Sequence, residues 1–290
     1  MKALLYGIYP RSDDLRKEIN RWERFGQKED LKKAFRSETL SLESTFDSYA
    51  LTYTDPLFNW NDILRPVALS MEHVKLGELR RYMETNTFYR QPVIDHYPSF
   101  SEVEKDPYPY FPLYYGESSL AFLPSISTFL SMSSVNKNLD RKKLFGSIFD
   151  VYTDILSKYG KSSVLLFGVD PVDQDEIQYV EMLSDTCSVT VISPRKVNKT
   201  PFLKITEKIE GVASVDSLDI LPNSRCPVYI GVIDSKNTRV EDPEYVRDIV
   251  SKAESSGNLA GITTSDYLDF LPRVIADRKA KVMSEVINGE

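Results

Sequence analysis

The chain has 290 residues, 41% of them hydrophobic, a formal net charge of −7 and a pI near 5.2. This length allows a full core, as two small domains or as one α/β barrel of roughly 250 residues. The acidic balance argues against nucleic acid as a partner, and no stretch approaches the roughly 18 consecutive apolar residues of a membrane span, so we expect a soluble, cytoplasmic protein.

The first 25 residues predict a strand that leads directly into a helix. The apolar run Ala3–Tyr9 ends at Pro10-Arg11, and the charged segment Ser12–Phe25 follows. In a parallel α/β fold, ligands bind at the carboxyl ends of strands, which places Arg11 at that end. The basic residues of the following helix, which begin with Arg16 and Lys17, suggest an anionic ligand. The alternative is a solvated helix face, because acidic residues are interspersed with the basic ones.

Strands and helices alternate through the second half of the chain. Apolar residues recur at helical spacing from Leu144 to Tyr159, and Gly160 can end that helix. The best-marked helix starts at Asp242-Pro243-Glu244 and ends at Gly257. The other expected elements are strands at Ser163–Val169, Ser188–Ile192, Ala213–Leu221, Val228–Ile233 and Leu259–Thr263, and helical segments at Asp173–Leu183, Thr200–Ile209 and Tyr267–Ile287.

The strand count predicts an α/β fold in which one (β/α)8 TIM-type barrel spans residues 1–290. Strands at Ala3–Tyr9 and Tyr49–Thr54, and a middle strand near Tyr82–Val93 or Leu113–Tyr115, bring the total to seven or eight. An open doubly wound sheet is the alternative. The middle third, Leu57–Gly116, is rich in Tyr and Pro and is predicted to be an irregular insertion with a functional or packing role.

Residues suited to metal or nucleotide chemistry are scarce. Cys187 and Cys226 are expected at the starts of strands, away from the ligand-binding end, and His73 and His96 have no second ligand at motif spacing. We expect the cysteines to be buried hydrophobic residues and the chain to hold no metal ion by itself. Glycine-rich phosphate or dinucleotide motifs and nucleophile elbows are absent from the sequence.

Polar residues at the predicted strand ends form the candidate site. Carboxylates there could hold an amino group or a pterin-like amide, while cations hold carboxylates. For each Asp, helix capping is the alternative role. The candidate ligand-binding residues are Arg11, Arg16, Lys17, Asp55, Asn59, Trp60, Asp62, Asn86, Asp170 and Asp234.

Three blocks of the sequence resemble cobalamin-independent methionine synthases. Gly7–Arg11 is similar to the opening turn of that family, Thr85–Pro92 to its Thr-Asn-aromatic segment, and Gly231–Glu241 to its late Gly-Val-Asp strand. The resemblance implies a (β/α)8 barrel and transfer of a methyl group from a methylfolate or related pterin to a thiol such as homocysteine. It also implies that Arg11, Arg16 and Lys17 contact carboxylates of the pterin tail.

The zinc-ligand positions of that family are altered in this chain. Val191–Pro194 stands where the family has His and Cys, and Leu218–Ile220 stands where it has Glu. The family segment that contains the last Cys ligand aligns with Thr263–Tyr267, which has no Cys. The chain therefore resembles the amino-terminal barrel of the family, which implies a zinc-free subunit of a split methionine synthase. Zinc is then expected on a partner barrel chain.

Two other functions remain open. The chain could be a single-barrel relative of the uroporphyrinogen decarboxylase and corrinoid methyltransferase superfamily, which would need a substrate-sized pocket at the strand ends. It could also be a non-catalytic scaffold subunit that docks a partner through the Tyr-rich segment Tyr97–Tyr115.

Overall fold

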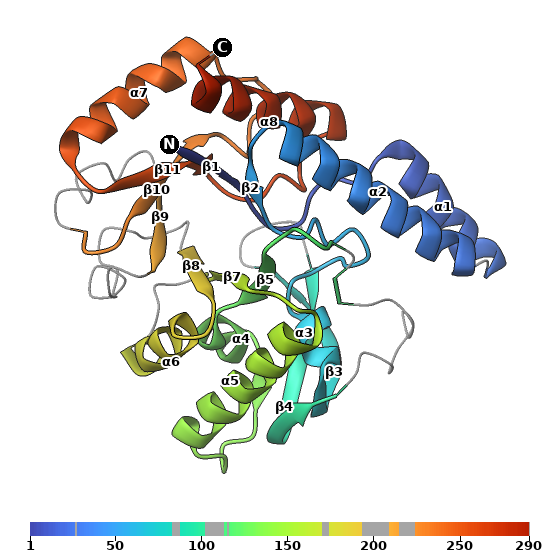
Figure 1. The fold of residues 1–290 in the computed structure, drawn as a ribbon. Coiled ribbons are helices and arrows are strands. Elements are labelled where there is room, and N and C mark those ends of the chain that lie inside the picture. The colour runs from blue at the N-terminus through green and yellow to red at the C-terminus, as the bar shows by residue number, and fades with distance from the viewer. Residues whose placement is uncertain are drawn as a thin grey trace.

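A curled sheet of eight parallel strands forms the centre of the molecule (Figure 1). The computed structural model describes residues 1–26, 28–82, 88–101, 113–114, 116–169, 174–192, 209–214 and 224–289. Within these ranges the strand order is β2-β1-β11-β10-β9-β8-β7-β5. The strands are β1 (Lys2–Leu5), β2 (Thr52–Tyr53), β5 (Ala121–Pro124), β7 (Ser163–Phe167), β8 (Ser188–Ile192), β9 (Glu210–Ser214), β10 (Val228–Ile233) and β11 (Leu259–Thr264).

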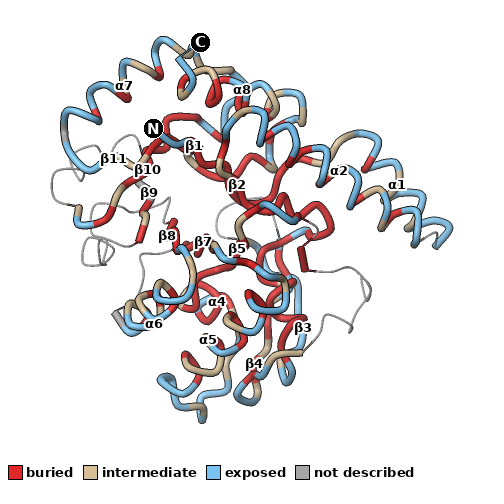
Figure 2. The backbone as a smooth tube through the Cα atoms, in the orientation of Figure 1, coloured by how far each residue is buried: buried red, intermediate tan, exposed pale blue. Residues whose placement is uncertain are grey.

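Helices follow most of these strands and expose their outer faces, while the strands themselves are buried (Figure 2). This burial on both faces explains why strands such as β7 and β10 are nearly continuous apolar runs instead of alternating ones. The helices are α1 (Asp13–Phe25), α2 (Lys28–Ser48), α3 (Arg65–Leu69), α4 (Ile126–Ser131), α5 (Arg141–Lys158), α6 (Gln174–Ser184), α7 (Pro243–Ser256) and α8 (Arg273–Asn288).

The two edges of the curled sheet meet at one bridge. Thr54, just after β2, pairs in parallel with Leu120, just before β5. Asp55 N donates to Leu120 O at 3.0 Å, and Leu120 N donates to Tyr53 O at 2.9 Å. The carboxyl end of β2 is therefore level with the amino end of β5, a stagger that affects where Asp55 lies.

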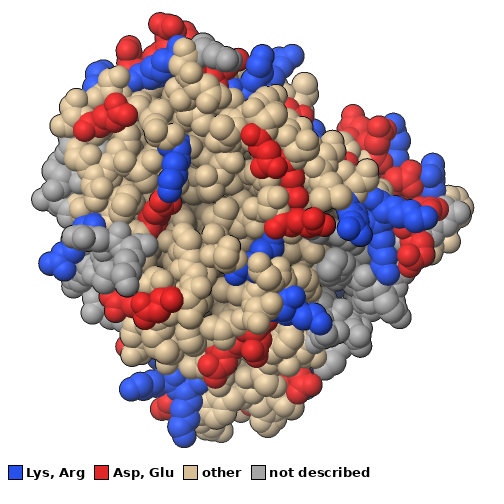
Figure 3. All heavy atoms as spheres, in the orientation of Figure 1, with Lys and Arg blue, Asp and Glu red and all other residues tan. Residues whose placement is uncertain are grey.

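Helices α1 and α2 form an arm on one side of the sheet (Figure 1). Ser12 caps α1 by accepting a hydrogen bond from Leu15 N at 3.1 Å, and Gly26 ends it with φ +70°. An N-terminal Ser cap and a C-terminal Gly are common signals for the ends of a helix. The helix predicted at Ser12–Phe25 is confirmed. Basic and acidic side chains alternate on the arm (Figure 3).

The middle third of the chain is more regular than its composition predicts. β3 (Met71–Arg81) and β4 (Phe88–Phe100) form a long antiparallel hairpin, and β6 (Ser134–Val135) extends it into a second sheet. The expected middle strand of the parallel sheet is wrong at both proposed positions, because β5 fills that place. β5 has only four residues and ends at Pro124, so its periodic signal is weak. The segment 102–112, which contains three of the six prolines of this third, lies outside the described residues.

The later strands agree well with the sequence. β8 and β10 have the predicted bounds, and β7 and β11 differ from the predicted bounds only at the carboxyl end. β9 begins three residues earlier than expected. α7 begins after Asp242, whose carboxylate accepts a hydrogen bond from Glu244 N at 3.0 Å. The long helix α2 was not predicted, and the expected helix Thr200–Ile209 falls almost entirely outside the described residues.

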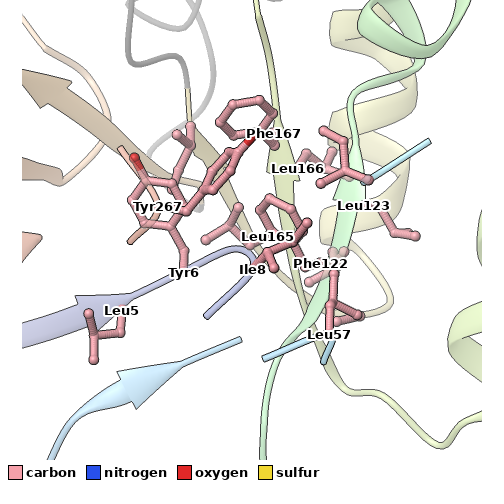
Figure 4. Packing of buried hydrophobic residues seen from close by; sticks show 14 of the residues in the cluster. Leu5, Tyr6, Ile8, Leu57, Phe122, Leu123, Leu165, Leu166, Phe167 and Tyr267 are labelled. Atoms are coloured by element: carbon pink, nitrogen blue, oxygen red, sulfur yellow. The ribbon is translucent and has the colours of Figure 1, made fainter. Parts of the chain in front are cut away.

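Apolar side chains fill the inside of the curled sheet (Figure 4). Leu165 and Phe167 from β7 pack with Phe122 from β5, and the Phe122 and Phe167 ring centroids are 5.7 Å apart. Tyr267, which follows β11, contacts Phe167 edge-on at 5.6 Å. Among the described helices, none has both the length and the apolar character needed to span a membrane.

Candidate functional site

The carboxyl ends of β1 and β11, the second and third strands from one edge of the sheet, lie side by side. Leu4 pairs with Thr263, and the Thr263 hydroxyl donates to Leu4 O at 2.7 Å. Tyr6 and Tyr267, which follow these strands, lie side by side over the apolar interior (Figure 4). Burial raises the pKa of the Tyr6 hydroxyl well above its usual value, and the nearby Asp266 carboxylate raises it further.

Close packing fixes the turn after β1 against the turn after β11. Gly7 has φ +79°, and a Cβ at this position would lie 2.5 Å from Tyr267 Cβ. Gly7 N also donates to Thr54 Oγ1 at 2.8 Å, which ties the same turn to the end of β2. Gly7 is thus required both for its backbone conformation and for space.

Two carboxyl groups follow β11, and their surroundings differ. Asp266 is 9% exposed and accepts a hydrogen bond from Tyr267 N at 3.0 Å. Asp269 Oδ1 is buried and accepts no hydrogen bond from the described residues. Burial, with a contribution from Asp266, raises the pKa of Asp269 to about 7, against the opposing effects of Phe270 N–H and Arg11. Asp269 is therefore a carboxyl group that can carry a proton near neutral pH.

Asp269 and Phe270 line two adjoining cavities. The inner one, about 30 Å³, lies among Asp62, Tyr82 and Tyr267 and has room for only a few water molecules. The outer one is a groove of about 540 Å³, a size typical of small-ligand sites. Its charged lining consists of Arg11, Asp13, Arg16, Asp269, Arg273 and Asp277.

Arg11 is held at the groove by neutral acceptors. Its Nε donates to Phe58 O at 2.6 Å, and its Nη2 donates to Trp60 O at 2.8 Å and to Asn61 Oδ1 at 3.0 Å. These bonds fix the position of the guanidinium beside the groove. Arg11 therefore both anchors the loop after β2 and contributes positive charge to the groove.

The other two basic candidates differ in position. Arg16 is exposed and lines the groove, and its side chain makes no hydrogen bond or ion pair with the described residues. Lys17 does not line the groove, and its Nζ pairs with Asp14 at 2.8 Å on the exposed surface of α1. The structure thus brings Arg11 and Arg16 together but not Lys17.

Arg273 is a groove residue that sequence reasoning missed. Its guanidinium pairs with Glu38 of α2 at 2.7 Å and with Asp277 at 2.8 Å, and it lies over the Tyr9 ring at 5.2 Å from the centroid. It joins three segments distant in sequence. The sequence does offer one indication of this role: Arg273 begins the last helix, shortly after the strand β11 ends.

Asp55 lies at the opposite end of neighbouring strands. Its carboxylate accepts hydrogen bonds from Leu57 N at 2.9 Å and Gly116 N at 2.6 Å. Lys161, which precedes β7, donates to Gly116 O at 2.7 Å and to Ser119 O at 2.8 Å. Burial raises the pKa of Asp55, and the Lys161 ammonium opposes that rise. The stagger at the sheet edge explains this location, where Asp55 fixes the loop before β5.

The remaining predicted residues of the loop after β2 are buried. The Trp60 indole N–H donates to Leu113 O at 3.1 Å, and Asn59 is 2% exposed. Asp62 accepts hydrogen bonds from Leu64 N at 3.0 Å and Arg65 N at 2.7 Å, so it binds N–H groups at the start of α3, a structural role close to the helix capping weighed for such residues. Asp62 also lines the inner cavity.

Asp234 belongs to a different groove, and two candidates cannot be placed. Asp234 Oδ1 accepts from Lys236 N at 2.8 Å, and the residue lines a groove with Arg239, Glu241 and Tyr245. Asn86 and Asp170 lie outside the described residues.

Zinc does not fit the described residues. No group of three or more His, Cys, Asp or Glu side chains in the described ranges could hold a metal ion. Cys226 is buried just before β10, and Cys187 precedes β8. The His73 and His96 rings pair on the hairpin with centroids 5.7 Å apart. These donors do not converge, so we derive no step through a metal ion on this chain.

The raised pKa of Asp269 predicts how the stability of the Asp269→Asn variant depends on pH. Because this pKa exceeds the value of about 3.8 in the unfolded chain, ionisation of Asp269 disfavours the folded state. Asp269→Asn should therefore gain stability over the parent as pH rises from about 4 to 7, reaching a constant gain of about 2–4 kcal/mol above pH 7. Urea unfolding at pH 5, 7 and 8 measures this, and a loss of stability at pH 8 would contradict it.

Comparison with known proteins gives structural relatives only. No family profile matches the sequence, and no curated protein matches it. A B12-independent methionine synthase from Shewanella sp. W3-18-1, solved in complex with selenomethionine, has TM-score 0.67 and 14% identity over 91% of this chain and 90% of its own. A putative vitamin-B12-independent methionine synthase from Listeria monocytogenes has TM-score 0.69 and 12% identity over 99% and 97%.

The chain shares the fold of these B12-independent methionine synthases. The resemblance seen in the sequence is thereby supported at the level of the fold. Since the two relatives are matched over 90% and 97% of their own length, they are chains of similar extent.

Proposed function

We propose that this chain is a methionine synthase-like protein that binds a methylfolate- or pterin-type methyl donor for transfer to a thiol such as homocysteine. In this proposal its sheet closes into a (β/α)8 barrel through the Thr54–Leu120 bridge, and the donor occupies the groove beside α1. The thiol is activated by zinc on a partner barrel chain.

The observation that supports the proposal most is the charge arrangement of the groove. Arg11 and Arg16 from the first βα unit line one groove of about 540 Å³, together with Arg273 from the last helix, whose guanidinium is also paired with Glu38 and Asp277. Guanidinium groups bind carboxylates well, so this end suits the polyanionic tail of a folate. The proton-carrying Asp269 at the inner end suits a polar ring. A methyl donor of this class has both parts.

The shared fold favours a second candidate, a complete single-barrel methyltransferase. Both relatives are named as methionine synthases and are matched over most of their length. In that case the isolated chain would transfer the methyl group without a partner.

One assay separates the two candidates. The purified chain, alone and mixed with a zinc-bearing methionine synthase barrel, is supplied with 5-methyltetrahydrofolate triglutamate and homocysteine, and methionine is measured. The split-enzyme proposal expects methionine only from the mixture, with a lower rate for Arg16→Gln at limiting donor. Methionine from the isolated chain supports the second candidate. Failure of this chain to raise the rate of the partner would contradict the first.

A further inference from the structure

The two histidines of the chain meet on the β3–β4 hairpin, although they are far apart in the sequence. The rings of His73 in β3 and His96 in β4 have centroids 5.7 Å apart and planes at 70° to each other. Both residues are exposed, and neither ring makes a hydrogen bond or an ion pair with another described residue. The ring nitrogens of both imidazoles are therefore available to a shared ligand.

A bulge in the hairpin brings the two rings together. Between two paired stretches of the ladder, His73 alone lies opposite residues 95–98 of β4. His73 has a φ of +63° in this bulge. Residues with a Cβ seldom adopt this backbone conformation, and those that do are concentrated at functional positions. The fold thus keeps an unfavourable backbone conformation at the point where the imidazoles meet.

The spacing of the rings suits a metal ion held between them. Zinc binds imidazole nitrogens at about 2.0–2.1 Å, so one ion shared by two rings places the ring centres roughly 5–6 Å apart. The 5.7 Å between the rings of His73 and His96 lies in this range. Neutral imidazole is the commonest metal ligand in proteins, and it suits Zn²⁺, Ni²⁺ and Cu²⁺.

The carboxylates that precede the two histidines are engaged in other contacts. Glu72 accepts a hydrogen bond from the Ser99 hydroxyl at 3.4 Å, and Asp95 pairs with Lys75 at 3.5 Å. Among the described residues, no third His, Cys, Asp or Glu side chain joins the pair to hold an ion. An ion at this place would therefore have two imidazole ligands, with water in its other positions.

We propose that His73 and His96 form a surface site for one divalent transition-metal ion such as Zn²⁺. Each neutral ring donates a nitrogen lone pair to the ion, which joins β3 to β4 across the bulge and stabilises the hairpin. The pair lies at the open end of the hairpin, whereas Tyr82 and Tyr89 at its other end line the inner cavity. The site is thus separate from the proposed methyl-donor groove and does not depend on the proposed function.

The experiment measures binding of Zn²⁺ and Ni²⁺ to the full chain, produced without a histidine tag, by isothermal titration calorimetry. The parent should bind one ion per chain, and EDTA should remove it. His73→Asn and His96→Asn should each weaken binding about tenfold or more, and the double variant should lose little beyond either single variant, because one missing ring already breaks the chelate. Asn is the replacement because it tolerates the positive φ of His73.

Two control variants test the other donors. Cys187→Ser removes the partly exposed thiol, and Glu72→Gln removes the charge of the carboxylate next to His73; each should change the affinity less than about twofold. Mg²⁺ should not compete with Zn²⁺, because Mg²⁺ prefers oxygen ligands.

Thermal unfolding gives a second readout. Zn²⁺ should raise the unfolding midpoint of the parent and leave that of both His variants unchanged, while in EDTA all three proteins should unfold at similar temperatures. Absence of binding by the parent, or equal affinity in the parent and both His variants, would overturn the inference. Losses in Cys187→Ser or Glu72→Gln as large as those in the His variants would overturn it too, because the ion would then be held by other groups. None of these outcomes bears on the methyl-donor groove, whose test is methionine formation.

Discussion

Lys279→Met should lower the free energy of unfolding by about 3–5 kcal/mol, the cost of breaking a buried ion pair from one side. Lys279 is fully buried in α8, and its Nζ donates to Arg239 O at 2.7 Å and to both Glu241 oxygens at 2.8 Å. Glu241 Oε1 also accepts a hydrogen bond from Asp234 N at 2.9 Å. Removing the ammonium leaves a carboxylate without its cation and loosens the loop after β10.

The matched control is Lys281→Met, two residues further along the same helix. Lys281 pairs with Glu285 at 3.5 Å, with a side chain that is 63% exposed, so its loss should cost about 0.5 kcal/mol or less. Urea unfolding of both variants measures the difference. Similar losses in the two variants would show that the buried pair is not essential to the loop.

Gly7→Ala should destabilise the chain by about 2–5 kcal/mol and abolish ligand binding. An added Cβ meets Tyr267 Cβ at 2.5 Å and Cγ at 2.8 Å, and the positive φ adds a backbone penalty. Because Tyr267 precedes Asp269 and Phe270 in the same turn, its displacement moves the candidate site.

Gly26→Ala isolates the backbone part of this effect. Gly26 has a similar φ of +70°, and a Cβ there meets nothing within 4 Å. This substitution should cost about 1 kcal/mol and leave binding intact. Chemical denaturation and binding of 5-methyltetrahydrofolate triglutamate compare the two variants, and equal losses would refute close packing against Tyr267.

The sequence predicts the parts of the fold that local physics determines. β10 is a continuous apolar run, and α7 has its cap, proline and closing glycine in order. β5 is too short for a periodic signal, and the β3–β4 hairpin depends on pairing between strands that composition does not reveal.

The candidate site was predicted only in part. Arg11 and Arg16 follow the first strand, so strand-end reasoning finds them. Asp55 is misplaced by that reasoning, because the stagger between β2 and β5 brings it to the amino ends of neighbouring strands. Arg273 and Asp269 become significant only when the last helix packs against the first turn, which is a long-range contact.

The most direct test of the account is a crystal structure of the chain with 5-methyltetrahydrofolate triglutamate. We expect the glutamyl carboxylates beside Arg11 and Arg16 and the pterin ring at the inner end of the groove, near Asp269. A donor bound instead in the groove beside Asp234, or with its ring away from Asp269, would contradict the account.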